Sequence, residues 1–192
     1  MKTNSDLVIS TPPAANTSFS TSVGPGGRGR KQTLALAGLY AALYVAVVAI
    51  FPFLSFLQLN VRVADGLRGM LRFWPWAVFL GNFVAATLAN FLFSPLGFYD
   101  VALSPSVSTL TIAVAWVIGS KGAGMIDEKY SYFVGYFVHS LLLGTYLSWL
   151  LSFVLNLPFI GLWPLLITGT FVSDCVLPYV LYRALKIRLG RF

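Results

Sequence analysis

The chain has 192 residues, of which 57% are hydrophobic, 16% are aromatic and only 10% are charged. A soluble domain this apolar could not cover its own surface, so the composition excludes an ordinary soluble protein. The net charge of +7 favours contact with anionic lipid over nucleic-acid binding, because the basic residues flank apolar segments and form no separate patch. We expect a multi-pass protein of the cell membrane, all-α in fold.

Residues 1–32 are expected to form a disordered cytoplasmic tail, because they are rich in Ser, Thr, Asn, Pro and Gly and contain no apolar run. The tail lacks the order of charge, apolar run and small residues that marks a signal peptide. Residues 33–192 are expected to form one transmembrane domain with six helices.

Six apolar segments are separated by Gly, Pro and charged residues. Their predicted ranges are 33–51, 61–73, 74–93, 101–118, 130–155 and 161–185. Crossing a hydrocarbon core of roughly 30 Å takes about 20 helical residues, so the second segment is too short to span untilted.

The first segment carries small residues at four-residue spacing, namely Gly38, Ala42 and Ala46. Such a stripe lets another helix approach closely. It could serve a partner protein or the packing of the chain's own helices, and the sequence does not separate these alternatives.

The second segment has a charged face. Arg62, Asp65, Arg68 and Arg72 are spaced to share about a third of the circumference of an α-helix. One interpretation is structural: Arg62 and Asp65 neutralise each other, while Arg68 and Arg72 reach towards the cytoplasm.

The other interpretation is a ligand site, because further polar residues are expected at the same outer end. They are Gln58 and Asn60 before the segment, Asn90 at the end of the third segment and Asp100 at the start of the fourth. Together with Trp116, Phe98 or Tyr99, they would suit a flat ligand with polar edges.

The fifth and sixth segments each hold one isolated polar residue. His139 is more easily explained as a packed, hydrogen-bonded histidine than as a ligand or proton relay. Asp174 is expected to pair with Arg68, Arg72 or His139, or to line a ligand cavity. Pro178 is expected to kink the last helix.

Both termini are predicted to be cytoplasmic by the positive-inside rule. The basic residues near the first segment are Arg28, Arg30 and Lys31, and those near the end of the last are Arg183, Lys186, Arg188 and Arg191. The loops 52–61, 94–100 and 156–160 then lie outside.

Nothing in the chain predicts an enzyme, a metal site or a bound cofactor. No second histidine or carboxylate stands at metal-ligand spacing from His139, and the single Cys175 excludes an intramolecular disulfide. The Gly-rich stretch 24–31 lacks the lysine of a phosphate-binding loop, so the chain is not expected to hydrolyse ATP on its own.

The stretch Asn60-Val-Arg-Val-Ala-Asp-Gly-Leu67 is similar to the Gln-Phe-Arg-Ile-Ser-Glu-Ala-Leu segment of the QueT family. Further matching positions are Gly81, Leu88-Ala-Asn90, Gly97-Phe-Tyr-Asp100 and Ser108-Thr-Leu110. On these residues the chain resembles a QueT-type S-component of an energy-coupling-factor (ECF) vitamin transporter. It departs from the family in the shorter side chains of Asn60 and Asp65, and in lacking a glycine near residues 104–106.

The resemblance implies a membrane subunit that binds a small molecule outside and docks on a T-component with two cytoplasmic ATPases. The implied ligand is a queuosine precursor, a 7-deazaguanine such as preQ1 or queuine. The implied ligand-binding residues are Asn60, Arg62, Asp65, Asn90 and Asp100, and the implied docking residues are Gly38, Ala42 and Ala46.

Three alternatives stay open at this point. The same architecture could carry riboflavin, thiamine or a pterin, because fold does not determine substrate. The second alternative is a standalone proton-coupled transporter, which would use His139 or Asp174 as its proton relay. The third alternative is a membrane scaffold. The sequence leaves open the affinity, the oligomeric state and whether coupling partners are dedicated or shared.

Overall fold

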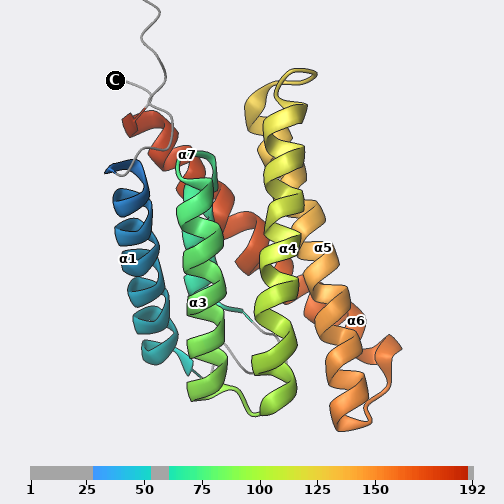
Figure 1. Ribbon diagram of the computed structural model, residues 1–192. Helices are drawn as coiled ribbons and strands as arrows, with labels where there is room; N and C mark the ends of the chain where they lie inside the picture. The colour runs from blue at the N-terminus through green and yellow to red at the C-terminus, as the bar shows by residue number, and fades with distance from the viewer. Residues whose placement is uncertain (1–27, 53–60, 190–192) are drawn as a thin grey trace, which may run out of the picture.

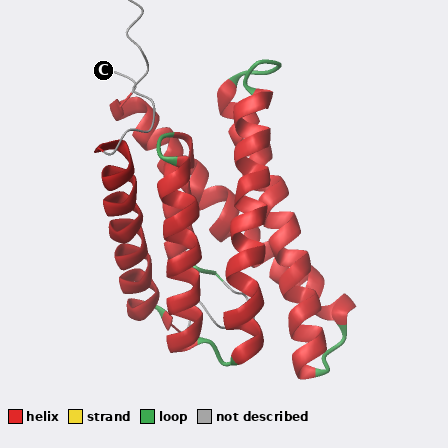
Figure 2. Ribbon diagram, viewed as in Figure 1, coloured by secondary structure: helices red, strands yellow, loops and turns green. Residues whose placement is uncertain are grey.

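The computed structural model describes residues 28–52 and 61–189, and this part of the chain is helical without strands (Figures 1 and 2). Its elements are α1 (Arg28–Ile50), η1 (Val63–Arg72), α3 (Pro75–Phe93), α4 (Phe98–Gly122), α5 (Glu128–Leu155), α6 (Phe159–Thr170), η2 (Phe171–Val176) and α7 (Leu177–Leu189). The last three form one continuous helical span, Phe159–Leu189. Residues 1–27, which hold most of the predicted tail, lie outside the described part, and α1 begins five residues before the predicted start.

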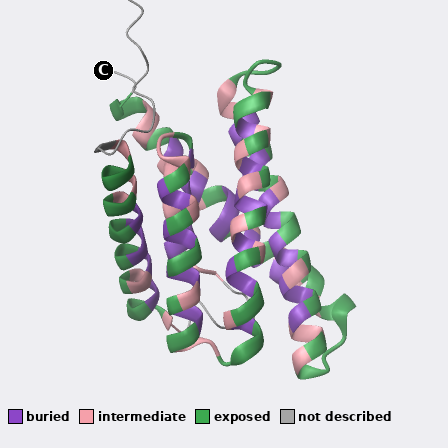
Figure 3. Ribbon diagram, viewed as in Figure 1, coloured by how far each residue is buried: buried purple, intermediate pink, exposed green. Residues whose placement is uncertain are grey.

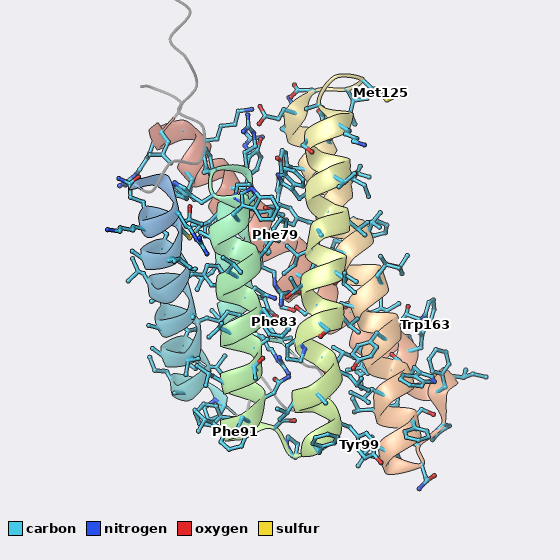
Figure 4. The ribbon with its side chains drawn as sticks, in the orientation of Figure 1. Phe79, Phe83, Phe91, Tyr99, Met125 and Trp163 are labelled. Carbon is cyan, nitrogen blue, oxygen red and sulfur yellow. The ribbon has the colours of Figure 1, made fainter. Side chains whose placement is uncertain are left out.

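Five of the described helical spans are long and apolar enough to cross a membrane. Their outer faces carry large exposed apolar side chains, while small and polar residues are turned inward (Figure 3). Figure 4 shows Phe91, Tyr99 and Trp163 on the outside of the bundle, where their exposed fractions are 72%, 48% and 40%. An apolar exterior around an interior that also holds polar side chains suits lipid as the surrounding solvent.

The helices α1 and α3 run in the same direction, whereas α4, α5 and the final span alternate (Figure 1). Residues 51–74 therefore return the chain to the end of the bundle from which α1 started. We call the end where α1 begins and α7 ends the terminal end, and the opposite end the far end. Phe91 and Tyr99 lie at the far end and Met125 at the terminal end (Figure 4).

The second segment is not the α-helix that the sequence predicts. Within it, η1 is a 3-10 helix of ten residues and is not among the five long apolar spans. A 3-10 helix has three residues per turn, so residues three apart lie in line. Asp65, Arg68 and Leu71 form one buried row that points into the bundle.

A second row of η1 faces α7. A Cβ on Gly66 would stand 3.3 Å from Leu177 Cβ, and one on Gly69 would stand 2.8 Å from Leu181 Cβ. The backbone of η1 thus lies directly on α7, which leaves no room for a side chain at Gly69. The glycine row of η1 contacts α7, and the row of Asp65 and Arg68 points into the bundle. These two requirements account for the threefold spacing of residues in the segment.

The last span contains a π-helical turn, η2, directly before Pro178. Proline lacks the N–H that would bond to the carbonyl of residue 174, and its ring needs extra space in the preceding turn. The widened turn supplies that space, so the predicted disruption at Pro178 takes the form of a π turn. The same turn carries Asp174, which is fully buried.

The helix α1 presents two faces made of small residues. Ala37 and Ala41 are buried against α3, where a Cβ on Gly81 would lie only 2.8 Å from the carbonyl oxygen of Ala37. Gly38 and Ala42 are exposed, as is Ala46, and nothing lies within 4 Å of a Cβ built on Gly38. The stripe singled out from the sequence is therefore not used for packing within the described chain.

Ion pairs connect the helical elements at the terminal end of the bundle. Glu128, in the first turn of α5, accepts from Arg72 Nε at 2.5 Å and from Lys186 Nζ at 2.8 Å. Asp127 caps α5 by accepting from the backbone N–H of Lys129, and this hydrogen bond lowers the pKa of Asp127. The end of η1 is thus joined to α5 and α7.

Candidate ligand-binding site

Arg68 lies at the centre of the bundle with 2% of its surface exposed. Its partners are Asp65 on η1, Asn82 on α3, Ser108 on α4, His139 on α5 and Asp174 on η2. Ser108, His139 and Asp174 stand near the midpoints of their helical spans. A guanidinium group has five N–H donors, so each of them can be directed to a different one of these partners.

The distances define a connected network. Arg68 Nη2 lies 2.8 Å from Asp65 Oδ1 and 3.0 Å from Ser108 Oγ, and Nε lies 3.3 Å from Asn82 Oδ1. The hydroxyl of Tyr44 on α1 donates to the same Asp65 oxygen at 2.6 Å. Asp65 and Arg68 thereby connect α1 to the other helices through buried, charge-assisted bonds.

Asp174 forms an ion pair with Arg68 Nη1, as one of the sequence-based alternatives proposed. His139 is buried, and its Nε2 lies 3.1 Å from Arg68 Nη1 and 3.4 Å from Asp174 Oδ1. Because arginine can only donate, Nε2 is the acceptor in this contact, which is the neutral form of the ring. The prediction of a packed, hydrogen-bonded histidine is confirmed.

A second polar cluster lies nearer the far end. Arg62 Nη1 donates to Asn90 Oδ1 at 3.2 Å, and Asn90 Nδ2 donates to the backbone carbonyl of Asp100 at 3.2 Å. The carboxylate of Asp100 is buried and accepts from the hydroxyls of Ser94 and Ser104. The start of α4 is therefore tied to the end of α3 and to the residue that precedes η1.

A cavity lies between these two clusters. Its polar wall is formed by Arg62, Asp65, Arg68, Asn90, Ser104 and Ser108, and its apolar wall by Ala86, Leu143 and Leu147. In this conformation about 20 Å³ is accessible to the centre of a water molecule. That is room for roughly one water, so binding a heterocycle requires the walls to move apart.

The structure brings three of the five predicted ligand-binding residues to this cavity, namely Arg62, Asp65 and Asn90. Asp100 is not in the wall, but it holds Ser104, which is. Asn60 lies outside the described residues.

Two parts of the structural interpretation of the second segment do not hold. Asp65 pairs with Arg68 instead of only balancing Arg62, and Arg68 does not reach towards the cytoplasm. The reason is the 3-10 geometry, which puts Asp65 and Arg68 in line on the inner face. Arg72 falls on the row that faces α7 and pairs with Glu128 at the terminal end.

The aromatic residues proposed for stacking do not line this cavity. Phe98 and Tyr99 are exposed at the start of α4, with 79% and 48% of their surfaces accessible. Trp116 packs edge-on against Phe79 and lines a separate hollow with Arg72 and Glu128. Apolar contact in the cavity comes instead from Leu143 and Leu147, whose spacing of four on α5 was the only signal for them in the sequence.

Comparison with known families gives one match. The family model for the QueT transporter matches residues 34–187, which is most of the chain and includes every residue of both polar clusters. Neither the curated proteins nor the solved structures contain a match. On its sequence over this range, and with five helices suited to crossing a membrane, the chain belongs to the QueT transporter family.

Proposed function

We propose that the protein is the substrate-binding subunit of an ATP-driven ECF importer and binds a 7-deazaguanine, such as preQ1 or queuine, from outside. The observation that carries this proposal is the cavity between helices, where Arg62, Asp65 and Asn90 face Leu143 and Leu147. Polar groups on one wall and apolar groups on the other suit a flat ring with hydrogen-bonding edges.

Each group has a chemical role in this proposal. The carboxylate of Asp65 accepts hydrogen bonds from the ring N–H and the exocyclic amine of the ligand, with Arg68 and Tyr44 holding it in place. Arg62 and Asn90 donate to the ring carbonyl, with Asn60 as a further contact. Asp100 supports this wall through Ser104, and the leucines of α5 cover the face of the ring.

The proposed topology has six crossings with both termini in the cytoplasm. It is supported by the return of the chain between α1 and α3, and by the ion-rich terminal end. The far-end loops around 94–97 and 156–158 contain no lysine or arginine, as expected of loops outside the cell. The cluster of Arg62, Asn90 and Asp100 then lies on the outer side of Arg68.

Transport in this proposal draws its energy from partners, so the chain is a transporter subunit and not an enzyme. The exposed stripe Gly38, Ala42 and Ala46 is the proposed docking surface for the T-component, which carries two ATPases. Small residues allow a partner helix to approach the α1 backbone closely.

Ligand binding tests the first part of the proposal. Isothermal titration of the purified protein with preQ1 should show binding that weakens by at least about tenfold in Arg62→Ala and in Asp65→Ala, because each removes a charge-assisted bond. Arg183→Ala is the matched control, since Arg183 lies at the terminal end. Unchanged binding in both cavity variants would overturn the assignment of the site.

Docking is tested separately. Gly38→Leu and Ala42→Leu should abolish uptake and copurification with the T-component while leaving ligand binding intact, because leucine separates the two helix backbones. Ala102→Leu, at an exposed small residue of α4, is the control. Undiminished uptake in both α1 variants would contradict this docking surface, and uptake without any ATPase would favour a standalone transporter.

A further inference from the structure

A hollow between the start of α5 and the last turns of α7 lies at the terminal end of the bundle. This α5–α7 hollow has a volume of about 320 Å³ and shares no residue with the central cavity. Its lining residues are Asp127, Lys129, Arg183, Lys186 and Ile187. Sites for small ligands commonly measure about 300–1,000 Å³, so the hollow is large enough for a small polar group. Three cations against one carboxylate favour an anion as that group.

The cations of the α5–α7 hollow are only weakly held by their partners within the protein. Lys129 Nζ lies 3.3 Å from the carboxylate of Asp127, and Lys186 Nζ lies 2.8 Å from that of Glu128, which also pairs with η1. Arg183 is exposed and, within the described part of the chain, forms no ion pair shorter than 4 Å. Exposed ion pairs contribute little to stability, so these cations can turn towards an incoming anion at small cost.

Two tyrosines indicate the depth of the α5–α7 hollow in the membrane. The hydroxyl of Tyr179 accepts from Arg183 Nη1 at 3.4 Å, and Lys129 Nζ lies 4.8 Å from the centre of the Tyr130 ring. Tyrosine is enriched where the membrane interior meets water. The hollow also lies at the terminal end of two helical spans that are suited to crossing a membrane (Figure 1). An anion bound there is therefore at the level of the lipid headgroups.

The surface next to the hollow, towards the middle of the bundle, is apolar. Phe133, one turn after Lys129 on α5, packs edge-on against Tyr179 of α7 with ring centres 5.3 Å apart. Phe133, Val176 and Val180 are exposed. The surface between α5 and the final span thus changes from cationic to apolar within about one helical turn. A free phosphate would contact only the cationic part, whereas a phospholipid would contact both.

We infer that the α5–α7 hollow binds the phosphate of an anionic phospholipid, such as phosphatidylglycerol, whose acyl chains lie against Phe133 and Val180. Arg183 and Lys129 donate charge-assisted hydrogen bonds to the phosphate oxygens, and Asp127 accepts from hydroxyl groups of the headgroup. A headgroup without net charge fits less well, because the cations of the hollow outnumber its carboxylate. This inference does not depend on which molecule the central cavity binds.

Native mass spectrometry of the purified protein tests the inference. In titrations with phosphatidylglycerol and with phosphatidylcholine of the same acyl chains, the first lipid should bind about tenfold more tightly or better. Glycerophosphoglycerol, which is the same headgroup without chains, should bind more weakly than the whole lipid. Equal affinities for the two lipids would overturn the inference. Equal affinities for the lipid and its free headgroup would show a site for soluble phosphates and overturn the assignment to lipid.

A double variant, Arg183→Gln with Lys129→Gln, locates the binding. It should weaken phosphatidylglycerol binding about tenfold or more and remove the preference over phosphatidylcholine, and Arg183→Gln alone should give a smaller loss of the same kind. Lys31→Gln with Lys121→Gln is the matched control, because it removes the same charge from exposed lysines at the same end. The control should keep the native affinity and preference. Equal weakening in the two double variants would show a diffuse effect of surface charge and contradict the inference, as would native affinity in the first.

Discussion

Arg68 is the residue on which the interior of the bundle depends, and its chemistry cannot be supplied by lysine. The five N–H donors of its planar guanidinium group point towards partners on η1, α3, α4, α5 and η2. A lysine ammonium has three donors on a single atom and cannot reach all five. Arginine at this position therefore organises the helices as well as balancing buried charge.

Arg68→Lys should unfold at markedly lower temperature than the native protein. Losing at least two buried hydrogen bonds, with partners left unsatisfied, costs about 1–3 kcal/mol each. For a chain of this size, the total corresponds to a drop of roughly 10 °C in melting temperature in detergent. Differential scanning fluorimetry measures this directly.

Arg72→Lys is the matched control for that measurement. Arg72 is about half exposed and pairs with Glu128 at the terminal end, where lysine can replace it with little loss. Similar melting temperatures for Arg68→Lys and Arg72→Lys would show that the central network does not stabilise the fold.

At the scale of elements, the 3-10 helix η1 and the π turn η2 meet at the Arg68–Asp174 ion pair. Long 3-10 and π segments are uncommon, and both tend to occur at functional sites. Here η1 lines the cavity with Asp65 and Arg68 and reaches the ion pairs of the terminal end through Arg72. One short helix thus connects the cavity wall to the ion pairs of the terminal end.

The contact between η1 and α7 depends on Gly69. An alanine Cβ there would lie 2.8 Å from both Leu181 Cβ and the backbone nitrogen of Tyr182, and closer still to the carbonyl oxygen of Pro178. Two of these atoms belong to the backbone of α7 and the third is a Cβ bonded directly to it, so none of them can easily shift. Gly69→Ala should therefore destabilise the protein by about 1–3 kcal/mol and displace Arg68 from its partners.

Thermal unfolding and preQ1 titration of Gly69→Ala check both effects. Gly38→Ala provides the comparison, because nothing lies within 4 Å of its added Cβ and alanine favours a helix. The explanation fails if Gly69→Ala is as stable as Gly38→Ala and binds ligand as well as the native protein.

For the whole molecule, the sequence was sufficient to predict the long helices and their approximate ends. Apolar runs bounded by Gly, Pro and charge mark them, and membrane crossing leaves few alternatives for such runs. The 3-10 form of η1 was not predicted from the sequence. Its threefold residue spacing can be explained only once its contact with α7 is known. The pairing of Asp174 with Arg68 was one of several sequence alternatives, because residues so far apart in the chain carry no shared periodicity.

The site was predictable to a similar degree. Arg62, Asp65 and Asn90 were expected at one end of the bundle from topology, and they do line the same cavity. Trp116, Phe98 or Tyr99 was suggested as the aromatic neighbour of the ligand, but hydropathy does not reveal which face of a helix meets lipid. Phe98 and Tyr99 are exposed. Leu143 and Leu147 carried no signal that separated them from other leucines of an apolar helix.

Cysteine labelling tests the orientation of the whole molecule. Pro95 lies in the loop between α3 and α4, and Met125 lies in the terminal-end loop before α5 (Figure 4). Both residues are exposed. In intact cells a membrane-impermeant maleimide should label Pro95→Cys and leave Met125→Cys unreacted until the membrane is permeabilised. The native chain is a suitable background, because its single cysteine, Cys175, is buried. Because α4 connects the two loops, labelling of both variants in intact cells would contradict a crossing by α4. The reverse pattern would place the far end on the cytoplasmic side.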